Sequence, residues 1–233
     1  MTDRPTAFVA GATGFTGRAV ARQDAEAHGV DLKLQVRPGS RGRAALGSDP
    51  RVVEVSLDDE DALVSALRGC DAILQLIGTV RARFDDETSY ESVDYGTTLK
   101  LLAAGQKAGV RHFVLLSSVG AGLGLGSYLS WKKRTEQAVR ESGLGWTIVR
   151  PSYLAGDAEL TERRELLALS AFLRGLSEAP IGGALAANLR PINIQVLARV
   201  LLHLVRAGPQ RRVLLGADLW RIAREEGLYP VVR

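Results

Sequence analysis

The chain has 233 residues, a formal net charge of +4, a pI of about 9.4 and a single cysteine, Cys70. This length suits one domain with a continuous core, and one cysteine excludes an internal disulfide and a cysteine-based metal cluster. The charges are scattered, without a helix-turn-helix, a zinc finger or an aromatic-studded basic strand, so nucleic-acid binding is not expected. No apolar run spans a membrane or forms a secretory signal before the first predicted strand, so we expect a cytoplasmic protein without a membrane span.

The first predicted element is an apolar strand, Thr6–Ala10, followed by three glycines spaced three apart and then a helical pattern. This order predicts a dinucleotide site, because glycines allow a tight turn and let a pyrophosphate approach bare backbone at a helix N-terminus. The spacing differs from the Gly-x-Gly-x-x-Gly fingerprint, and a structural glycine turn is the alternative. The predicted cofactor contacts in this loop are Gly11, Thr13, Gly14, Phe15, Thr16 and Gly17.

A helix from Arg18 to about His28 and a strand over Leu32–Val36 come next, and Arg37 follows the strand directly. An enzyme for NAD carries Asp or Glu near this position to bind the ribose hydroxyls. Here the strand runs into a segment with several arginines and no carboxylate, which suits the 2′-phosphate of NADP. We therefore predict that Arg37, Ser40 and Arg41 bind NADP, with an exposed basic loop as the alternative.

Val52–Val55 is predicted as a third strand, and the helix after it, through Leu67, has Asp58 as its expected N-cap. Asp58 is also placed to meet the adenine edge of a cofactor. A fourth strand, Ala72–Ile77, ends at a glycine that permits close passage of the cofactor ribose. The contacts predicted at this strand end are Leu76, Ile77 and Gly78.

Later elements continue the alternation. A long helix is predicted over Ser92–Ala108. The residues expected on its inward face are Val93, Leu99, Leu102 and Ala103. The fifth strand, His112–Leu116, ends in Ser117 and Ser118; a glycine-rich segment then leads into a helix that begins near Ser127. A sixth strand, Gly145–Arg150, is closed by a proline.

Strands and helices that alternate in this way predict an α/β fold, a doubly wound parallel sheet of the Rossmann type, as a single domain over residues 1–233. Ligands of such sheets bind outside the carboxyl ends of the strands, where the residues singled out above converge. Residues 152–233 are expected to add a small substrate or lid region with helices over 158–174 and 194–207, a loop at 180–183 and a strand at 213–215. An apolar substrate would suit the side chains of Leu154, Phe172, Leu173, Leu176 and Ile181, although core packing explains them equally well.

Tyr128 and Lys132 stand four residues apart, on one helical face just after the fifth strand. A tyrosine can give a proton to a carbonyl oxygen as hydride arrives, and a neighbouring ammonium favours its phenolate form. Lys132 can also bind the cofactor ribose. Ser118, at the strand end, would hydrogen-bond the substrate oxygen. No metal site is predicted.

The run from Gly11 to Gly17, the strand end at residues 115–120, Tyr128 with Lys132, and residues 147–152 together resemble the atypical short-chain dehydrogenase/reductases. The NmrA-like and complex I accessory-subunit-like branches are the most similar. The resemblance implies NAD(P) binding and the catalytic set Ser118, Tyr128 and Lys132. It adds a segment that passes the nicotinamide, and the cofactor contacts expected around it are Ser117, Pro151, Ser152 and Tyr153.

Two features depart from that family pattern. Ser118 and Tyr128 are only ten residues apart, closer than in the catalytic members. Asp94 stands where many members carry an active-site asparagine. Either feature is compatible with a rearranged or silent catalytic centre.

The sequence therefore predicts an NADPH-dependent oxidoreductase acting on a carbonyl or quinone-like small molecule. A non-catalytic NADP(H)-binding sensor or assembly protein is the alternative. A sugar-nucleotide epimerase or dehydratase is disfavoured by the short region after Pro151. The resemblance also implies a possible homodimer.

Overall fold

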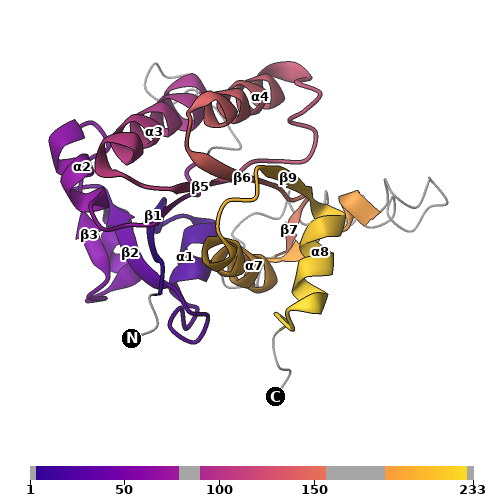
Figure 1. Ribbon diagram of the computed structural model, residues 1–233, viewed down its shortest axis with the longest axis horizontal. Coiled ribbons are helices and arrows are strands. Elements are labelled where there is room, and N and C mark those ends of the chain that lie inside the picture. The colour runs from indigo at the N-terminus through magenta and orange to yellow at the C-terminus, as the bar shows by residue number, and fades with distance from the viewer. Residues whose placement is uncertain (1–3, 79–89, 156–186, 230–233) are drawn as a thin grey trace.

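The computed structural model describes residues 4–78, 90–155 and 187–229. A seven-stranded sheet crosses the middle of the molecule (Figure 1), with the strand order β3-β2-β1-β4-β5-β6-β9 and every neighbouring pair parallel. This confirms the predicted doubly wound sheet. The strands are β1 Thr6–Ala10, β2 Asp31–Val36, β3 Val52–Glu54, β4 Ala72–Gln75, β5 His112–Leu116, β6 Gly145–Arg150 and β9 Arg212–Leu215.

The direction in which strands are added reverses at β1. Chain order proceeds outward from β1 through β2 to β3, and then restarts on the other side with β4, β5 and β6. Loops from the two sides diverge at such a switch point and leave a crevice at the carboxyl ends of the strands. The glycine loop after β1 and the loop after β4 lie at this point.

Helices cover both faces of the sheet (Figure 1). One face carries α1 Phe15–Ala21, α7 Ile194–Ala207 and α8 Gly216–Glu225, and the other carries α2 Glu60–Leu67, α3 Thr97–Ala108 and α4 Gly126–Glu141. Two further helical segments are the 3₁₀ helix η1 Arg41–Leu46 and the π-helix η2 Glu91–Gly96.

Each face has its own hydrophobic core. The alternation of side chains along β1 places Ala7 and Val9 in the core under α1 and α7, and Phe8 and Ala10 in the core under α2 and α3. All four side chains are fully buried. Burial on both faces explains why the strand is apolar from Ala7 to Ala10 and not alternately polar.

A separate two-stranded parallel ladder lies beyond β6. It pairs β7 Leu154–Ala155 with β8 Ile192–Asn193, with Leu154 opposite Ile192. The hydroxyl of Ser152 donates to the carbonyl of Arg190 at 2.9 Å, which adds a side-chain hydrogen bond between the same two segments. Residues 156–186, which include the predicted helix 158–174, the loop 180–183 and Phe172, Leu173, Leu176 and Ile181, lie outside the described residues.

Several predicted boundaries needed correction. The first helix spans Phe15–Ala21 and not Arg18–His28. Directly after its end, the amide of Gln23 bonds the carbonyl of Val20, three residues back. The helix after β3 begins at Glu60, so Asp59 and not Asp58 is its N-cap and accepts from the amide of Ala62 at 3.0 Å. Several acidic residues in a row offer alternative caps, and the pattern alone does not choose between them.

The inward face of α3 also differs from the prediction. Leu99 is 41% exposed and Ala103 is exposed, whereas Leu101 and Leu102 are buried as part of the core. The inner face includes Thr98, which is fully buried. Because threonine is polar, a prediction based on hydrophobicity does not place it on the inner face. The hydroxyl of Thr98 donates a hydrogen bond to the carbonyl of Asp94 at 2.7 Å, which allows its burial.

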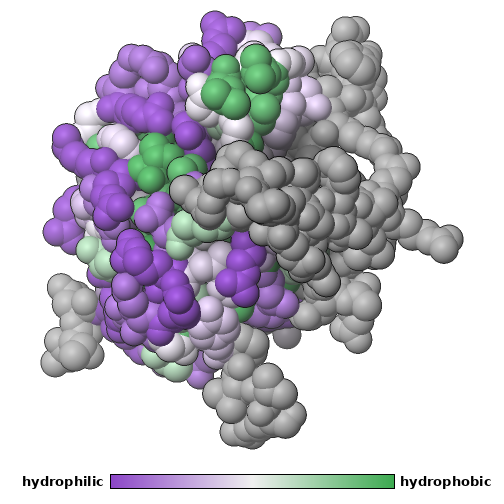
Figure 2. Space-filling model, turned by 90° about the vertical axis from the view of Figure 1, so that its right-hand side faces the viewer, coloured by the Kyte–Doolittle hydropathy of each residue, from purple (hydrophilic) through white to green (hydrophobic). Residues whose placement is uncertain are grey.

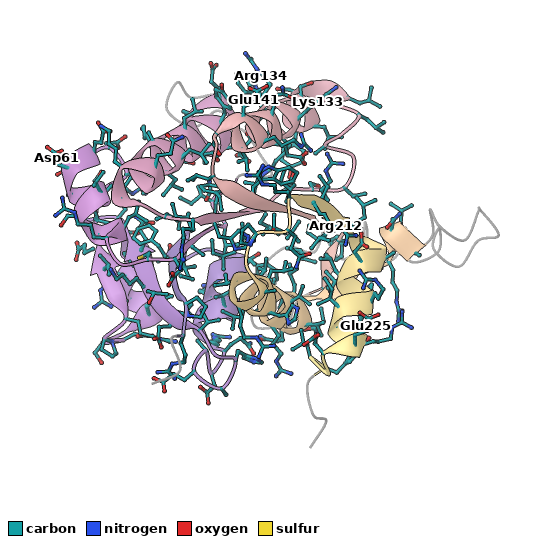
Figure 3. All side chains as sticks on the ribbon, in the orientation of Figure 1. Asp61, Lys133, Arg134, Glu141, Arg212 and Glu225 are labelled. Atoms are coloured by element: carbon teal, nitrogen blue, oxygen red, sulfur yellow. The ribbon has the colours of Figure 1, made fainter. Side chains whose placement is uncertain are left out.

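The coloured part of the face in Figure 2, which shows the described residues, is largely hydrophilic with a few separate hydrophobic areas. Charged side chains on α2, α4, β9 and α8 point outward in Figure 3, where Asp61, Lys133, Arg134, Glu141, Arg212 and Glu225 are labelled. Leu123 and Leu125, in the loop between β5 and α4, are each 70% exposed. Among the described residues, no helix combines the length and the apolar character needed to cross a membrane.

Candidate dinucleotide and catalytic site

The glycine loop is held together by close backbone contacts. Gly11 has a φ of +89°, and a Cβ there would lie 3.0 Å from the amide nitrogen of Ile77. A Cβ at Gly17 would lie 2.1 Å from the carbonyl oxygen of Gly11, so no larger residue fits without moving the loop. Gly14 is exposed, and its amide donates to the carbonyl of Gly11 at 3.0 Å. The loop therefore has a tight inner side and a bare backbone surface at Gly14.

The side chains of this loop point to different places. Phe15 is half-buried and packs against the core beneath α1, and Thr16 is buried, with 6% of its surface exposed. Thr13 is half-buried and faces η1. Since these side chains are occupied with packing, the backbone offers most of the surface that a phosphate could approach.

The predicted NADP-binding segment lies against the glycine loop. A Cβ at Gly42 would be 2.7 Å from the Cβ of Thr13, so the absence of a side chain brings the two segments into contact. Ser40 is the N-cap of η1 and accepts from the amide of Gly42 at 3.2 Å. Arg37, at the end of β2, is exposed. For Arg41 the structure describes only the backbone.

Sequence analysis missed Gly42. Its signal was a glycine between two arginines in a run that was read only for its charge.

The loop after β4 is held by a buried amide. Gln75 is fully buried, accepts from the amide of Ile77 at 2.9 Å and donates to the hydroxyl of Thr98 at 3.1 Å. Gln75 was also missed, because it lies within an otherwise apolar strand. Leu76 and Ile77 are half-buried beside it, and Ile77 contacts the position of Gly11.

A buried ion pair beside this loop joins η2 to α4. The ammonium of Lys132 lies 2.6 Å from a carboxylate oxygen of Asp94, and the two side chains are 7% and 2% exposed. A Cβ at Gly78 would lie 3.0 Å from that ammonium and 3.2 Å from that oxygen. Three residues singled out in the sequence therefore meet at one place, and Asp94 reaches it from the π-helix η2.

Tyr128 lies one turn before Lys132 on α4. The Lys132 ammonium is 5.7 Å from the centre of the Tyr128 ring, and the ring of Tyr90 meets the Tyr128 ring edge-on at 5.4 Å between centres. The neighbouring Lys133 points to the outer surface of the helix, so Lys132 is the lysine that shares the face of Tyr128. Ser118 is half-buried at the end of β5, where its hydroxyl donates to the carbonyl of Val119 at 3.3 Å.

Ser117 has a different partner from the one expected of a cofactor contact. Its buried hydroxyl donates to a carboxylate oxygen of Glu136 at 2.7 Å. Glu136 is fully buried and also binds Arg150 and Arg140. Burial acts to raise the pKa of Glu136, but the hydrogen bonds from Arg150 and Ser117 and the nearby positive charges outweigh it and lower the pKa.

The segment after β6 passes the same strand ends. The carbonyl of Pro151 accepts from the amide of Val119 at 2.9 Å, and Tyr153 is 8% exposed with its carbonyl bonded to the amide of Ile192 at 2.9 Å. Ser152 uses its hydroxyl in the tie to Arg190 described above. This segment is thus fixed beside the loop that follows Ser118.

Two predicted positions lie away from this cluster. Asp58 is exposed and forms an ion pair with Lys100 of α3. Leu154, in β7, is half-buried and packs against the core under α7.

Comparison with known proteins places this geometry in a family. The model of the NAD(P)H-binding family matches residues 11–177. The chain belongs to this family of atypical short-chain dehydrogenase/reductases. Residues 11–177 include the glycine loop, the basic segment, the Asp94–Lys132 pair and Tyr128.

Several proteins to which the chain is similar are named as reductases. The chain is 37% identical over 146 residues to a (4-alkanoyl-5-oxo-2,5-dihydrofuran-3-yl)methyl phosphate reductase of Streptomyces griseus, covering 62% of this chain and 46% of that protein. It is 25% identical over 193 residues to an NAD(P)H azoreductase of Xenophilus azovorans, covering 82% of this chain and 63% of that protein. The aligned regions span 26% to 59% of the length of four other relatives of the family, which are plant proteins.

Solved structures agree on the fold. A dTDP-glucose 4,6-dehydratase of Streptomyces venezuelae superimposes with a TM-score of 0.65 at 20% identity, covering 95% of this chain and 81% of that chain. At this identity the likeness concerns the fold alone.

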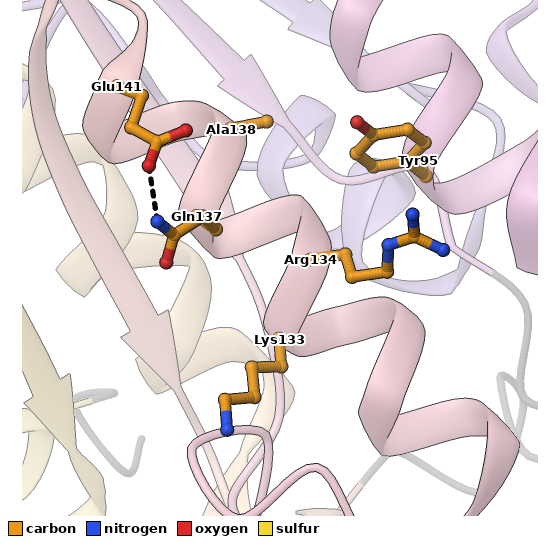
Figure 4. Close-up of a pocket in the computed structure, with 6 residues that line it drawn as sticks. All are labelled: Tyr95, Lys133, Arg134, Gln137, Ala138 and Glu141. Atoms are coloured by element: carbon orange, nitrogen blue, oxygen red, sulfur yellow. Dashed lines mark hydrogen bonds between the residues drawn. The ribbon is translucent and has the colours of Figure 1, made fainter.

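A shallow pocket of about 280 Å³ lies on the outer surface of α4 (Figure 4). It is lined by Tyr95, Lys133, Arg134, Gln137, Ala138 and Glu141. The Arg134 guanidinium lies 4.5 Å from the ring centre of Trp131 and 5.8 Å from that of Tyr95, and Gln137 donates to Glu141. None of the predicted site residues lines this pocket, so it is separate from the dinucleotide crevice.

Proposed function

We propose that this protein is an NADPH-dependent oxidoreductase that reduces a carbonyl or quinone-like small molecule. The observation that carries the proposal is the meeting of Gly78, Asp94 and Lys132, with Tyr128 one helical turn away, in a member of an NAD(P)H-binding family with reductases among its relatives.

The glycine loop fits the pyrophosphate of a dinucleotide. Gly11 is required by its close approach to the loop after β4, and Gly17 by its contact with Gly11. Gly14 presents bare backbone at the N-cap of α1 without a side-chain capping bond. Backbone amides at such an end attract an anion. A bare loop beside a strand switch point supports cofactor binding at this place.

NADPH is proposed over NADH because of the segment after β2. Arg37 is exposed there, and Gly42 packs the segment against Thr13 of the glycine loop. A guanidinium next to the phosphate loop suits a 2′-phosphate, which it can bind through paired hydrogen bonds. Ser40 and Arg41 belong to the same proposed subsite.

A bound reduced nicotinamide supplies the hydride. In the proposed reaction Tyr128 donates a proton to the substrate oxygen, Ser118 orients that oxygen, and the Lys132 ammonium favours the phenolate that remains. Asp94 holds the ammonium at 2.6 Å and so fixes its position beside the ring. Pro151, Ser152 and Tyr153 are proposed to line the nicotinamide end of the crevice.

Consumption of NADPH with a panel of quinones, aldehydes and ketones tests the proposal. We expect turnover with at least one apolar acceptor, and Tyr128→Phe should lower kcat by about 100-fold or more without changing the Kd of NADPH. Tyr95→Phe, in the pocket on the outer surface of α4, is the matched control and should leave kcat unchanged. Turnover that survives Tyr128→Phe would contradict the mechanism.

One observation favours a second candidate, a non-catalytic NADPH-binding protein. The hydroxyl of Ser118 is bonded to the carbonyl of Val119, and Lys132 is paired with Asp94, so both groups already have partners. Tight NADPH binding without turnover of any acceptor would support this candidate. The homodimer and the cellular compartment remain predictions under either candidate.

A further inference from the structure

Glu136 is a buried carboxylate that joins three elements around the proposed reaction centre. It belongs to α4 and is fully buried. One oxygen accepts from the hydroxyl of Ser117 and from Nε of Arg150, each at 2.7 Å, and the other accepts from both Arg150 and Arg140. Ser117 follows β5 directly and Arg150 ends β6, so one side chain ties α4 to two strand ends.

The same helical face carries the proposed catalytic groups. Tyr128, Lys132 and Glu136 follow one another at intervals of four residues along α4. Ser118 is the next residue after Ser117. A displacement of Glu136 relative to Ser117 would therefore change the position of Tyr128 and Lys132 relative to Ser118.

Arg150 extends the contact into the loop between β5 and α4. A Cβ at Gly122 would lie 2.9 Å from an Nη atom of Arg150, so the guanidinium fills the space that a side chain would need. The loop is also held at its far end, where the hydroxyl of Ser130 donates to the carbonyl of Gly124 at 2.6 Å. The loop is therefore fixed at two points between Ser118 and Tyr128.

We propose that Glu136 is a positioning residue for the reaction, which holds Arg150 and Ser117 and thereby sets the placement of Ser118 relative to Tyr128 and Lys132. This inference rests on the proposed oxidoreductase function. It also gives a reason for the interval of only ten residues between Ser118 and Tyr128, because a short connection held by a buried carboxylate has little freedom.

The test compares Glu136→Gln with wild type in the full chain. Gln keeps the size of the side chain but replaces a carboxylate oxygen with a donor that cannot accept from Arg150. We expect kcat to fall by about tenfold or more, while the Kd of NADPH and the KM of the acceptor change by less than about twofold, as for a loss of geometry at the chemical step. Glu141→Gln, an exposed carboxylate on the same helix, is the matched control and should match wild type.

A second variant guards against a folding defect in Glu136→Gln. Gly122 is at an exposed loop position, and Gly122→Ala leaves Glu136 unchanged. The added methyl group would push on the Arg150 guanidinium. Gly122→Ala should also lower kcat while the Kd of NADPH stays as in wild type. A wild-type kcat in both variants, or a loss of kcat matched by an equal loss of NADPH affinity, would overturn the inference.

Hydrogen exchange separates this inference from the proposed function. In Glu136→Gln the amides of residues 119–125 should exchange faster by about tenfold, while those of β1 stay as in wild type. If wild type turns over no acceptor, the oxidoreductase proposal fails and the positioning role fails with it, although faster exchange would still show that Glu136 holds the loop. If wild type turns over substrate but exchange and kcat are unchanged in Glu136→Gln, only the present inference fails.

Discussion

The glycine loop and the first turns of α4 both adjoin the loop after β4, but they are held by different kinds of interaction. A Cβ at Gly11 would contact Ile77, and the glycine loop depends on such close backbone approaches. On the other side, Gly78 adjoins the buried ion pair of Lys132 and Asp94, and the carboxylate of Glu136 is buried further along the helix. The glycine loop thus depends on glycines, which have no side chain, whereas α4 depends on buried charges that must be paired.

This difference has a physical consequence. A loop that depends on close approach tolerates no added volume, but it is insensitive to charge. A buried charge is stable only with its partner in place, so the side that contains α4 should respond to loss of a partner. The predictions below test this contrast, from the largest expected effect to the smallest.

Gly17→Ala should disrupt the glycine loop, because the new Cβ would lie 2.1 Å from the carbonyl oxygen of Gly11. We expect a loss of more than about 3 kcal/mol in the free energy of unfolding and no measurable NADPH binding. Urea unfolding and an NADPH titration measure both. Gly69→Ala, with a φ of +75° but open space around it, should cost only about 1 kcal/mol and leave binding intact. A Gly17→Ala protein with wild-type affinity would refute this account of the loop.

Removing one member of the Asp94–Lys132 pair should leave a buried charge without its partner. Asp94→Leu and Lys132→Met should each cost about 3 kcal/mol, and the double variant should cost less than their sum. A double-mutant cycle of urea unfolding measures the coupling. The exposed pair Arg221 and Glu225 on α8, with 3.0 Å between the charged groups, is the control and should show almost none. Strict additivity at Asp94 and Lys132 would contradict the contrast.

The stability of the protein should fall in mild acid because of His112 at the start of β5. Burial lowers the pKa of His112 from 6.5 to about 4. Its Nε2 lies 3.0 Å from the hydroxyl of Thr147, and its Nδ1 has no hydrogen-bond partner among the described residues. Between these two pKa values the unfolded chain binds a proton at His112 that the folded chain does not. The contribution of neutral His112 to the free energy of unfolding is therefore fully present above pH 6.5 and is lost as the pH falls toward 4.

The full effect of His112 is roughly 3 kcal/mol, since one pKa unit corresponds to about 1.4 kcal/mol. Unfolding by urea at pH 7.5 and at pH 4.5 measures it. In His112→Gln this part of the pH dependence should disappear while the remainder persists. An unchanged pH dependence in the variant would show that His112 titrates normally.

Arg37→Ala should give the smallest effect, a change of cofactor preference. We expect the Kd of NADPH to rise by about tenfold and the Kd of NADH to stay constant. Gly42→Ala should act in the same direction, because it would push the basic segment away from Thr13. Arg221→Ala, on α8, serves as a control for loss of positive charge. Equal losses for both dinucleotides would show that Arg37 does not read the 2′-phosphate.

Much of the side built from glycines was predictable from sequence. A strand, a glycine and a helix follow one another within residues 6–21, and the close approach of Gly17 to Gly11 joins neighbours in the chain. The approach of Gly11 to Ile77 is long-range and carries no such signal. The same locality explains why α7 was predicted with its observed ends, since its apolar stripe lies within one segment. Gly42 escaped because its contact, Thr13, lies on another segment.

The side built from buried charges was less predictable. Tyr128 and Lys132 stand out by their spacing, but the pairing of Lys132 with Asp94 and the contacts of Glu136 join residues far apart in the chain. A single sequence carries no signal for such a pairing. Ser117 shows the result, because it was expected at the cofactor and its hydroxyl instead binds Glu136.

The short ladder between β7 and β8 pairs Leu154 with Ile192, so the described residues on either side of residues 156–186 lie next to each other. The two points where the intervening stretch begins and ends are thereby fastened to each other. Insertions or deletions between them need not shift β6 or α7.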